Sequence, residues 1–175
     1  FCLGKFDKGW QLYAYRKYIT VKGEATYPAW QGENLSGKHL VVRPEQGLGD
    51  QLRFASVIHE IATEAKLVTL ECDPRLIDLY ERSFPKNVEL IGADVNFHGD
   101  SYVGVDCAAH IGDLSHYKRR SLDDFPEHCG FLQPDPVRVK YWTDYLSKFD
   151  GQVNVGVCWK SGDIKGVRNL YYTSM

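Results

Sequence analysis

The chain has 175 residues, 43% of them hydrophobic and 25% charged, a composition that supports one ordinary domain with a buried core. Its formal net charge of -2 provides no basic excess for binding a row of phosphates, so we expect no nucleic-acid partner. No apolar run is long enough to span a membrane, and the first residues lack the apolar block of a signal peptide, so we expect a cytoplasmic protein. The five cysteines include no C-x-x-C pair, which favours reduced thiols over disulfides or a zinc site.

The first part of the chain predicts a helix and a connector. In residues 5–18, Phe6, Trp10 and Tyr13 recur at helical spacing, with charged residues between them. A helix this short is marginal alone in water, so its aromatic side must pack on the following domain or on a helical neighbour upstream. Residues up to 37 are rich in glycine, proline and small polar residues and predict a connector. Because the chain lacks an initial Met and stops shortly after a predicted strand, we expect a piece of a longer protein.

From residue 38 the pattern alternates between apolar strands and helices. The predicted strands are continuously apolar, as expected where helices cover both faces of a sheet. This pattern predicts a Rossmann-like, doubly wound parallel sheet. The predicted strands are 38–43, 66–72, 87–92, one within 101–109 and a final buried one at 153–159; the predicted helices are 50–65, 74–84, 111–119 and 137–149, the last of them capped by Asp135 and Pro136.

A glycine turn leads from the first strand into the first helix of this pattern. The stretch RPEQGLGDQLRF places Gly47, Gly49 and Asp50 at the point where the strand ends. Ligands of open parallel sheets lie at the carboxyl ends of the strands, and glycines let another molecule approach the backbone closely. The N–H groups of a helix N-terminus are also exposed there. The turn is therefore a candidate binding site.

Three interpretations of this turn stay open on the residues alone. In the first it begins a dinucleotide fingerprint with Glu71 or Asp73 as the ribose acid, but Leu52 replaces the third glycine and Asp50 places a carboxylate where a pyrophosphate should rest. In the second, Asp50 is an ordinary helix N-cap and the glycines only form a tight turn. In the third, Asp50 is a general base that takes a proton from an acceptor hydroxyl.

Several further side chains are weaker candidates. Gln46 and Arg53 flank the turn and are placed to hydrogen-bond an acceptor, although capping and surface solvation also account for them. His110 follows an apolar strand, where it serves either as a site residue or as a structural histidine. Two pairings suggest themselves, Asp106 with His110 as acid and base, and Arg43 with Glu45 as an ion pair. For the tryptophans, core packing is favoured over sugar stacking; they are Trp30, Trp142 and Trp159.

The order of motifs carries a family resemblance. The strings GKFDKGWQLYAYR (4–16) and PAWQGENLSGKHLVVRPEQGLGDQLRFA (28–55) resemble the end of a tetratricopeptide-repeat array that runs into a glycosyltransferase of the heptosyltransferase-like, family 9-like type. The likeness continues through VTLECDPRLIDL (68–79), GFLQPDPVRVKYW (130–142) and VGVCWKSG (155–162). It therefore spans nearly the whole chain.

The resemblance implies a GT-B architecture, in which two Rossmann-like domains face each other across a cleft. It divides the chain into a repeat-derived helix and connector (1–37), an acceptor-side domain (38–150) and the start of a donor-side domain (151–175). Asp50 matches the family's proposed base, and Lys160 and Arg168 match the start of the donor side, where cations meet a diphosphate. The transfer would be inverting, independent of metal ions and without a cofactor.

The same resemblance implies the partners. These are a nucleotide-sugar donor, a sugar or protein acceptor, and a protein partner that binds upstream repeats. The chain alone is expected to be inactive, because most of a donor domain lies outside it. Two alternatives from other classes stay open: a non-catalytic binding scaffold linked to repeats, and a dinucleotide-binding oxidoreductase.

Overall fold

The computed structural model describes residues 4–16, 27–45, 47–93, 102–127, 130–149, 151, 153 and 155–157. The chain divides into two compact units, Phe1–Asp135 and Pro136–Met175, and each is described by itself. The predicted domain boundaries at residues 37 and 150 stay predictions.

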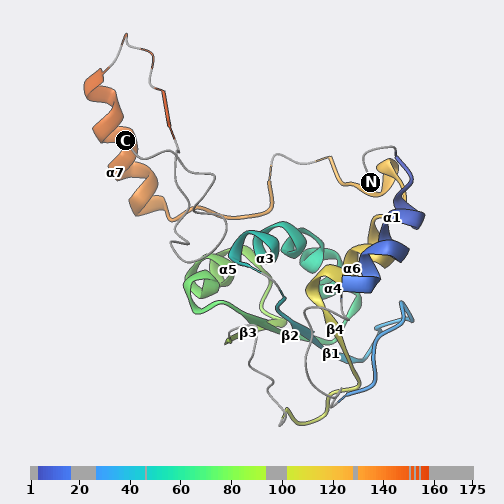
Figure 1. Cartoon of the computed structure of the whole chain (residues 1–175). Coiled ribbons are helices and arrows are strands. Elements are labelled where there is room, and N and C mark those ends of the chain that lie inside the picture. The colour runs from blue at the N-terminus through green and yellow to red at the C-terminus, as the bar shows by residue number, and fades with distance from the viewer. Residues whose placement is uncertain are drawn as a thin grey trace. The chain divides into compact units, whose positions relative to one another are not determined.

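Unit 1 is built on a parallel sheet of four strands. The strands are β1 (His39–Arg43), β2 (Leu67–Cys72), β3 (Val88–Gly92) and β4 (Cys107–His110), and their order is β3-β2-β1-β4 (Figure 1). The helices of this unit are α1 (Phe6–Tyr13), α3 (Leu48–Phe54), α4 (Ile58–Glu64), α5 (Ile77–Ser83) and α6 (Ile111–Lys118). A parallel sheet flanked by helices confirms the predicted Rossmann-like α/β fold.

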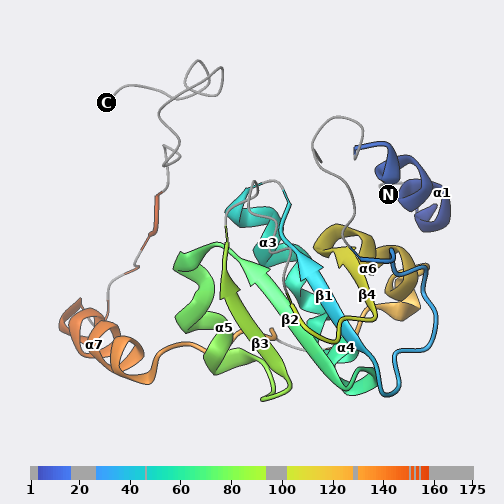
Figure 2. The same cartoon turned by 90° about the horizontal axis from the view of Figure 1, so that it is seen from below.

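The hydrophobic core lies between the sheet and its helices. Along β1 the side chains alternate, so that Leu40 and Val42 enter the core cluster with Ile58, Ile61 and Leu114 from the helices. Helices α3, α4, α5 and α6 lie over this same face of the sheet, and the view from below shows the strands in front of them (Figures 1 and 2). The sequence pattern had favoured helices on both faces; in the described residues the second face is covered by loop segments instead.

The loop that leads into β4 contributes to this second face. It is the end of the connection from β3, and β4 pairs with β1, on the other side of β2 from the strand where that connection began. The described end of this connection carries Tyr102, whose hydroxyl donates to Glu71 Oε1 of β2 at 3.1 Å. Tyr27, from the segment before β1, accepts a 2.9 Å hydrogen bond from the Tyr102 N–H. Polar side chains are therefore part of the cover on this face.

The predicted first helix packs on the domain that follows it. Helix α1 ends at Tyr13 and a 3₁₀ turn (Ala14–Arg16) continues it. The Trp10 indole N–H donates to the carbonyl of Arg119 at 2.6 Å, and the Tyr13 ring lies 5.6 Å from the ring of Phe54. Of the two neighbours that the sequence pattern allowed for the aromatic side, the structure shows contact with the following domain.

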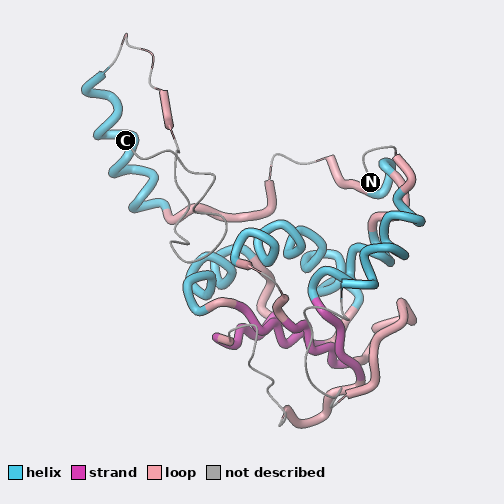
Figure 3. The backbone as a smooth tube through the Cα atoms, viewed as in Figure 1, coloured by secondary structure: helices cyan, strands magenta, loops and turns pink. Residues whose placement is uncertain are grey.

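The single helix predicted over residues 50–65 is three elements. Helix α3, a 3₁₀ turn (Ala55–Val57) and α4 follow one another. Figure 3 draws helices in cyan beside the magenta strands of the sheet. Short β-branched and small residues at the middle turn, Ala55 and Val57, are buried in the core. Packing against the sheet therefore sets the local backbone here, and periodicity alone had indicated one uninterrupted helix.

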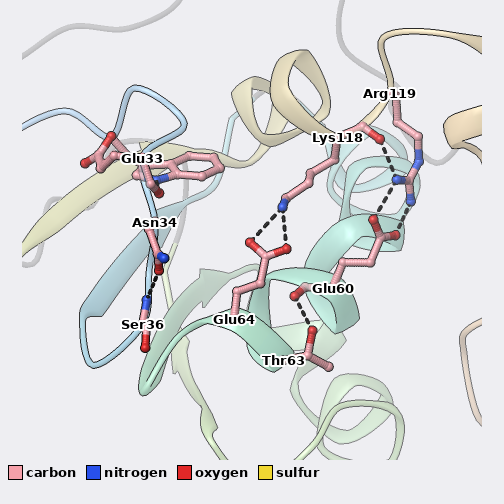
Figure 4. Close-up of polar contacts among 9 residues, drawn as sticks. Glu33, Asn34, Ser36, Glu60, Thr63, Glu64, Lys118 and Arg119 are labelled. Atoms are coloured by element: carbon pink, nitrogen blue, oxygen red, sulfur yellow. Dashed lines mark hydrogen bonds and ion pairs between the residues drawn. The ribbon is translucent and has the colours of Figure 1, made fainter.

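Ion pairs fix the end of α6 to α4. Lys118 Nζ lies 2.6 Å from Glu64 Oε1, and the buried guanidinium of Arg119 pairs with Glu60, with 2.8 Å between Nη1 and Oε2 (Figure 4). Since Arg119 also accepts the Trp10 indole bond through its carbonyl, this one residue joins α1, α4 and α6. The three helices thus form one layer.

Unit 2 contains α7 (Pro136–Leu146) followed by a 3₁₀ turn (Ser147–Phe149). Trp142 is 46% exposed and meets the rings of Tyr141 and Tyr145, so the expected core position of this tryptophan is wrong. The final buried strand predicted at 153–159 is also not found in its described residues, where Val153 and Val155 are exposed and lie outside any strand. An apolar run becomes a buried strand only beside a pairing neighbour, which the run itself cannot reveal.

Candidate functional site

The glycine turn stands at the carboxyl end of β1 and opens helix α3. Gly47 is the residue before the helix, in an extended conformation with φ -91° and ψ 173°, and its carbonyl accepts from the N–H of Asp50 at 3.1 Å and of Gln51 at 3.2 Å. Among the described residues, no side chain caps the start of this helix. Asp50 lies in its first turn, so the interpretation of Asp50 as the N-cap is wrong. The N-cap position is held by Gly47, three residues before Asp50.

The Asp50 carboxylate is accessible beside this uncapped helix end. Its side chain is 35% exposed, and Oδ1 lies 3.6 Å from Nη2 of Arg53, whose own side chain is 66% exposed. A Cβ atom placed on Gly47 would have Asp50 Oδ2 at 3.9 Å, and one placed on Gly49 would meet nothing within 4 Å. The carboxylate therefore borders an open backbone turn. A general base needs this combination of access to solvent and a bare approach.

Gln51 ties the turn to the neighbouring strand. Its side chain is buried, and its Oε1 accepts from the N–H of Asp73 at 2.9 Å, just beyond the end of β2. Asp73 in turn accepts two hydrogen bonds from Arg75 at its Oδ1 atom. The backbone N–H and the side-chain Nε of Arg75 each donate at 2.9 Å. These hydrogen bonds lower the pKa of Asp73 to about 2. The loops after β1 and β2 are therefore held together at one edge of the sheet.

Neither Glu71 nor Asp73 is placed to bind the ribose of a dinucleotide. Glu71 is fully buried under the Tyr102 hydroxyl, and Asp73 is engaged by Arg75 through both carboxylate oxygens. Neither carboxylate is presented to a ligand in the way a ribose hydroxyl requires. The geometry thus removes the support that the spacing of these two acids gave to the dinucleotide interpretation.

His110 ends β4 and stands directly beside β1. It is the cross-strand neighbour of Arg43, is half-buried, and precedes the first turn of α6.

The suggested acid–base pair of Asp106 and His110 is wrong. Asp106 precedes the strand and accepts from the His39 N–H at 2.8 Å, at the opposite edge of the sheet. A strand of four residues separates the two by about 13 Å, at roughly 3.3 Å per residue.

A buried ion-pair cluster lies where β1 leaves the sheet. Glu45, 3% exposed, accepts from Arg16 Nη2 at 2.7 Å and from Arg16 Nε at 3.0 Å, and the N–H of Gly112 at the start of α6 also donates to it. Arg16 Nη2 lies 3.1 Å from Oδ1 of Asp113. The expected pair of Arg43 with Glu45 is therefore wrong, because the carboxylate is held by an arginine 29 residues earlier. Burial raises the pKa of the Glu45 carboxyl, and Arg16 opposes this rise.

Arg43 itself was missed as a site residue in its own right. It is 7% exposed, and its Nε and Nη2 have no hydrogen-bond partner among the described residues. The sequence held a weak signal, because Arg43 directly follows a continuously apolar strand at the end of the sheet where ligands bind. Around it, desolvation and then the nearby charge of Glu71 raise the pKa of the Tyr102 hydroxyl to about 12.

Three predicted site residues, Gln46, Lys160 and Arg168, lie outside the described residues. In the ranges that the structure does describe, no group of histidine, cysteine and carboxylate side chains is arranged to hold a metal ion. Within the same ranges no helix has the length and apolarity that crossing a bilayer requires. Of the predicted site residues that the structure describes, Asp50 and Arg53 form an ion pair in α3 after the glycine turn, and His110 is the cross-strand neighbour of Arg43 at the carboxyl end of β4.

Comparisons with known proteins place the chain beside a longer relative. No family model matches it, and no solved structure matches it significantly. Protein FlbA of Caulobacter vibrioides is 31% identical over an alignment 175 residues long. The alignment covers 91% of this chain and 29% of that protein. The chain therefore spans less than a third of this relative's length, and the relative's name states no activity.

Proposed function

We propose that this chain forms the acceptor-side part of an inverting glycosyltransferase, with Asp50 as the general base. In this reaction the Asp50 carboxylate takes the proton of an acceptor hydroxyl, and the oxygen attacks the anomeric carbon of a nucleotide sugar. The bond from that carbon to the diphosphate breaks, and the nucleoside diphosphate leaves with the electron pair. The resemblance to heptosyltransferase-like enzymes supplies the reaction class.

One observation carries this proposal. Asp50 is a partly exposed carboxylate that borders an open glycine turn at the carboxyl end of a parallel sheet. A capping role does not account for it, because Gly47 takes the N-cap position. Its neighbour Arg53 is mostly exposed, so the pair is weakly held and the carboxylate is free to turn toward an acceptor.

Sugar transfer by the complete protein tests this proposal. Asp50→Asn should lower transfer from a panel of nucleotide sugars by about 100-fold or more, the usual contribution of a general base, with the fold unchanged. Asp78→Asn is the matched control, because Asp78 is an exposed aspartate in the first turn of α5. It should leave transfer unchanged.

The opposite results support the other function classes. Transfer that persists in the Asp50→Asn variant removes the general-base role. A complete protein that folds and binds its partners but transfers no sugar from any donor in the panel supports the repeat-linked scaffold. Binding of a nicotinamide dinucleotide to this chain would support the oxidoreductase, against the buried position of Glu71.

A further inference from the structure

The last residue of β1 is a buried arginine. Arg43 is 7% exposed, yet Nε and Nη2 of its guanidinium have no partner among the described residues. Buried polar groups in folded proteins are nearly always paired, and a buried charge without acceptors is strongly unfavourable. A residue that keeps such a charge at a candidate ligand edge invites a functional explanation.

The two Arg43 atoms without a hydrogen-bond partner among the described residues, Nε and Nη2, lie on one edge of the guanidinium. The N–H groups on Nε and Nη2 point in parallel, and this edge binds the two oxygens of a carboxylate or phosphate at once. Lysine offers no equivalent, because its ammonium is a single point charge. The atoms left open in Arg43 therefore correspond to a recognition geometry for a small anion.

Neighbouring side chains do not fill this edge. Glu71 follows the registered pair Val42–Leu70 and so lies in the same row on β2, but its Oε1 accepts from the Tyr102 hydroxyl at 3.1 Å. Glu45, two residues along the chain, is held by Arg16. The closest aromatic contact is the Tyr27 ring, with its centroid 5.8 Å from Arg43 Cζ, at the outer limit of a cation–π interaction.

The surroundings also place Arg43 at the predicted substrate side. It stands at the carboxyl end of β1, seven residues before Asp50, and His110 is its partner on β4. Two tyrosines interact with it, Tyr27 through its ring and Tyr102 electrostatically, and both are half-buried.

We propose that the Nε–Nη2 edge of Arg43 binds the carboxylate or phosphate group of a small ligand at the carboxyl end of the sheet. The identification of that ligand as the acceptor rests on the proposed function; anion binding by Arg43 does not. Arg43 is then a specificity-determining residue, which selects acceptors that carry an anionic group near the reacting hydroxyl.

Thermal unfolding of the 175-residue chain, with phosphate, acetate or chloride at constant ionic strength, tests this inference. Phosphate or acetate should raise the Tm of the wild-type chain relative to chloride, and the more effective of the two identifies the anion class. Arg43→Met should abolish this rise. It should also raise Tm in chloride by about 2–4 °C, because an apolar side chain replaces a buried guanidinium whose Nε and Nη2 have no hydrogen-bond partner among the described residues. Arg43→Lys should weaken anion binding by about tenfold or more.

Controls separate this inference from the proposed reaction. Arg75→Gln removes an exposed arginine that is already paired, and it should keep the anion-dependent rise in Tm. Asp50→Asn should keep it too, since that variant alters the reaction and not Arg43. The inference is overturned by a wild-type chain indifferent to both anions, by an Arg43→Met chain that still responds, or by one that is less stable or unfolded in chloride.

Discussion

Arg43 and Glu45 stand two residues apart at the end of one strand, both buried, and their surroundings differ. The carboxylate of Glu45 receives N–H groups from Arg16 and from the start of α6, so its charge is matched inside the fold. Nε and Nη2 of the Arg43 guanidinium, in contrast, have no hydrogen-bond partner among the described residues. Two charges buried at the same end of the sheet therefore have different roles. Glu45 holds the segment that follows α1 to the domain, and Arg43 is the residue that we propose binds a ligand.

The largest effect is expected from removing the paired charge. Glu45→Ala leaves Arg16 buried without its main partner, and this should lower the free energy of unfolding by about 3–5 kcal/mol. Denaturation in urea measures the loss. Glu81→Ala, which removes an exposed glutamate from α5, should stay within about 0.5 kcal/mol of the wild type. A similar small loss in both variants would show that Glu45 is not a structural charge.

A methyl group at Gly112 also tests the paired charge, Glu45. A Cβ there would lie 1.9 Å from Glu45 Oε1 and 2.9 Å from Arg16 Nη2, so the ion pair must shift. We expect Gly112→Ala to lower the free energy of unfolding by about 1–3 kcal/mol. In a Glu45→Ala background the same substitution should have less effect, because the clashing atom is gone. Equal effects in the two backgrounds would contradict the close packing of Gly112 on Glu45.

Acid sensitivity should come in part from Asp73, a half-buried carboxylate that pairs with Arg75 at the same edge of the sheet. Its pKa in the folded chain is lowered to about 2, below the value of about 3.9 in an unfolded chain. The depressed pKa stabilises the fold above pH 4 or so, and this contribution is lost as the pH falls from about 4 to about 2. Asp73→Asn should therefore lie closer in Tm to the wild type at pH 2 than at pH 6. A constant gap across this range would argue against the Asp73–Arg75 pair.

The smallest effect on stability is expected at Gly49. A Cβ there meets nothing within 4 Å, so Gly49→Ala should change the free energy of unfolding by about 0.5 kcal/mol or less. Its effect belongs to function, since the methyl group would stand on the bare turn beside Asp50. We expect reduced sugar transfer by the complete protein with an unchanged Tm. A destabilised variant would show that the turn is packed rather than open.

Continuously apolar runs predicted the strands of unit 1 well. Burial on a parallel sheet needs such runs, so Leu40 to Val42 and Val68 to Leu70 were identifiable from residue type alone. The glycine turn after β1 was likewise placed correctly, because the change from a strand pattern to a helix pattern leaves little room for error. Local chemistry sufficed for these elements.

Pairings across long stretches of sequence could not be predicted in the same way. Arg16 and Glu45 meet only because α1 packs beside α6, and no local pattern encodes that contact. Asp106 and His110 are close in sequence, yet an extended strand holds them at opposite edges of the sheet. The open donors of Arg43 depend on which acceptors the fold leaves nearby, which is a property of the assembled site.

The most direct measurement is the sign of two changes in the free energy of unfolding, made side by side in chloride. Arg43→Met should make the chain more stable, and Glu45→Gln should make it less stable. If both substitutions weaken the fold by comparable amounts, Arg43 is a structural residue like Glu45, and this edge of the sheet holds no charge set aside for a ligand.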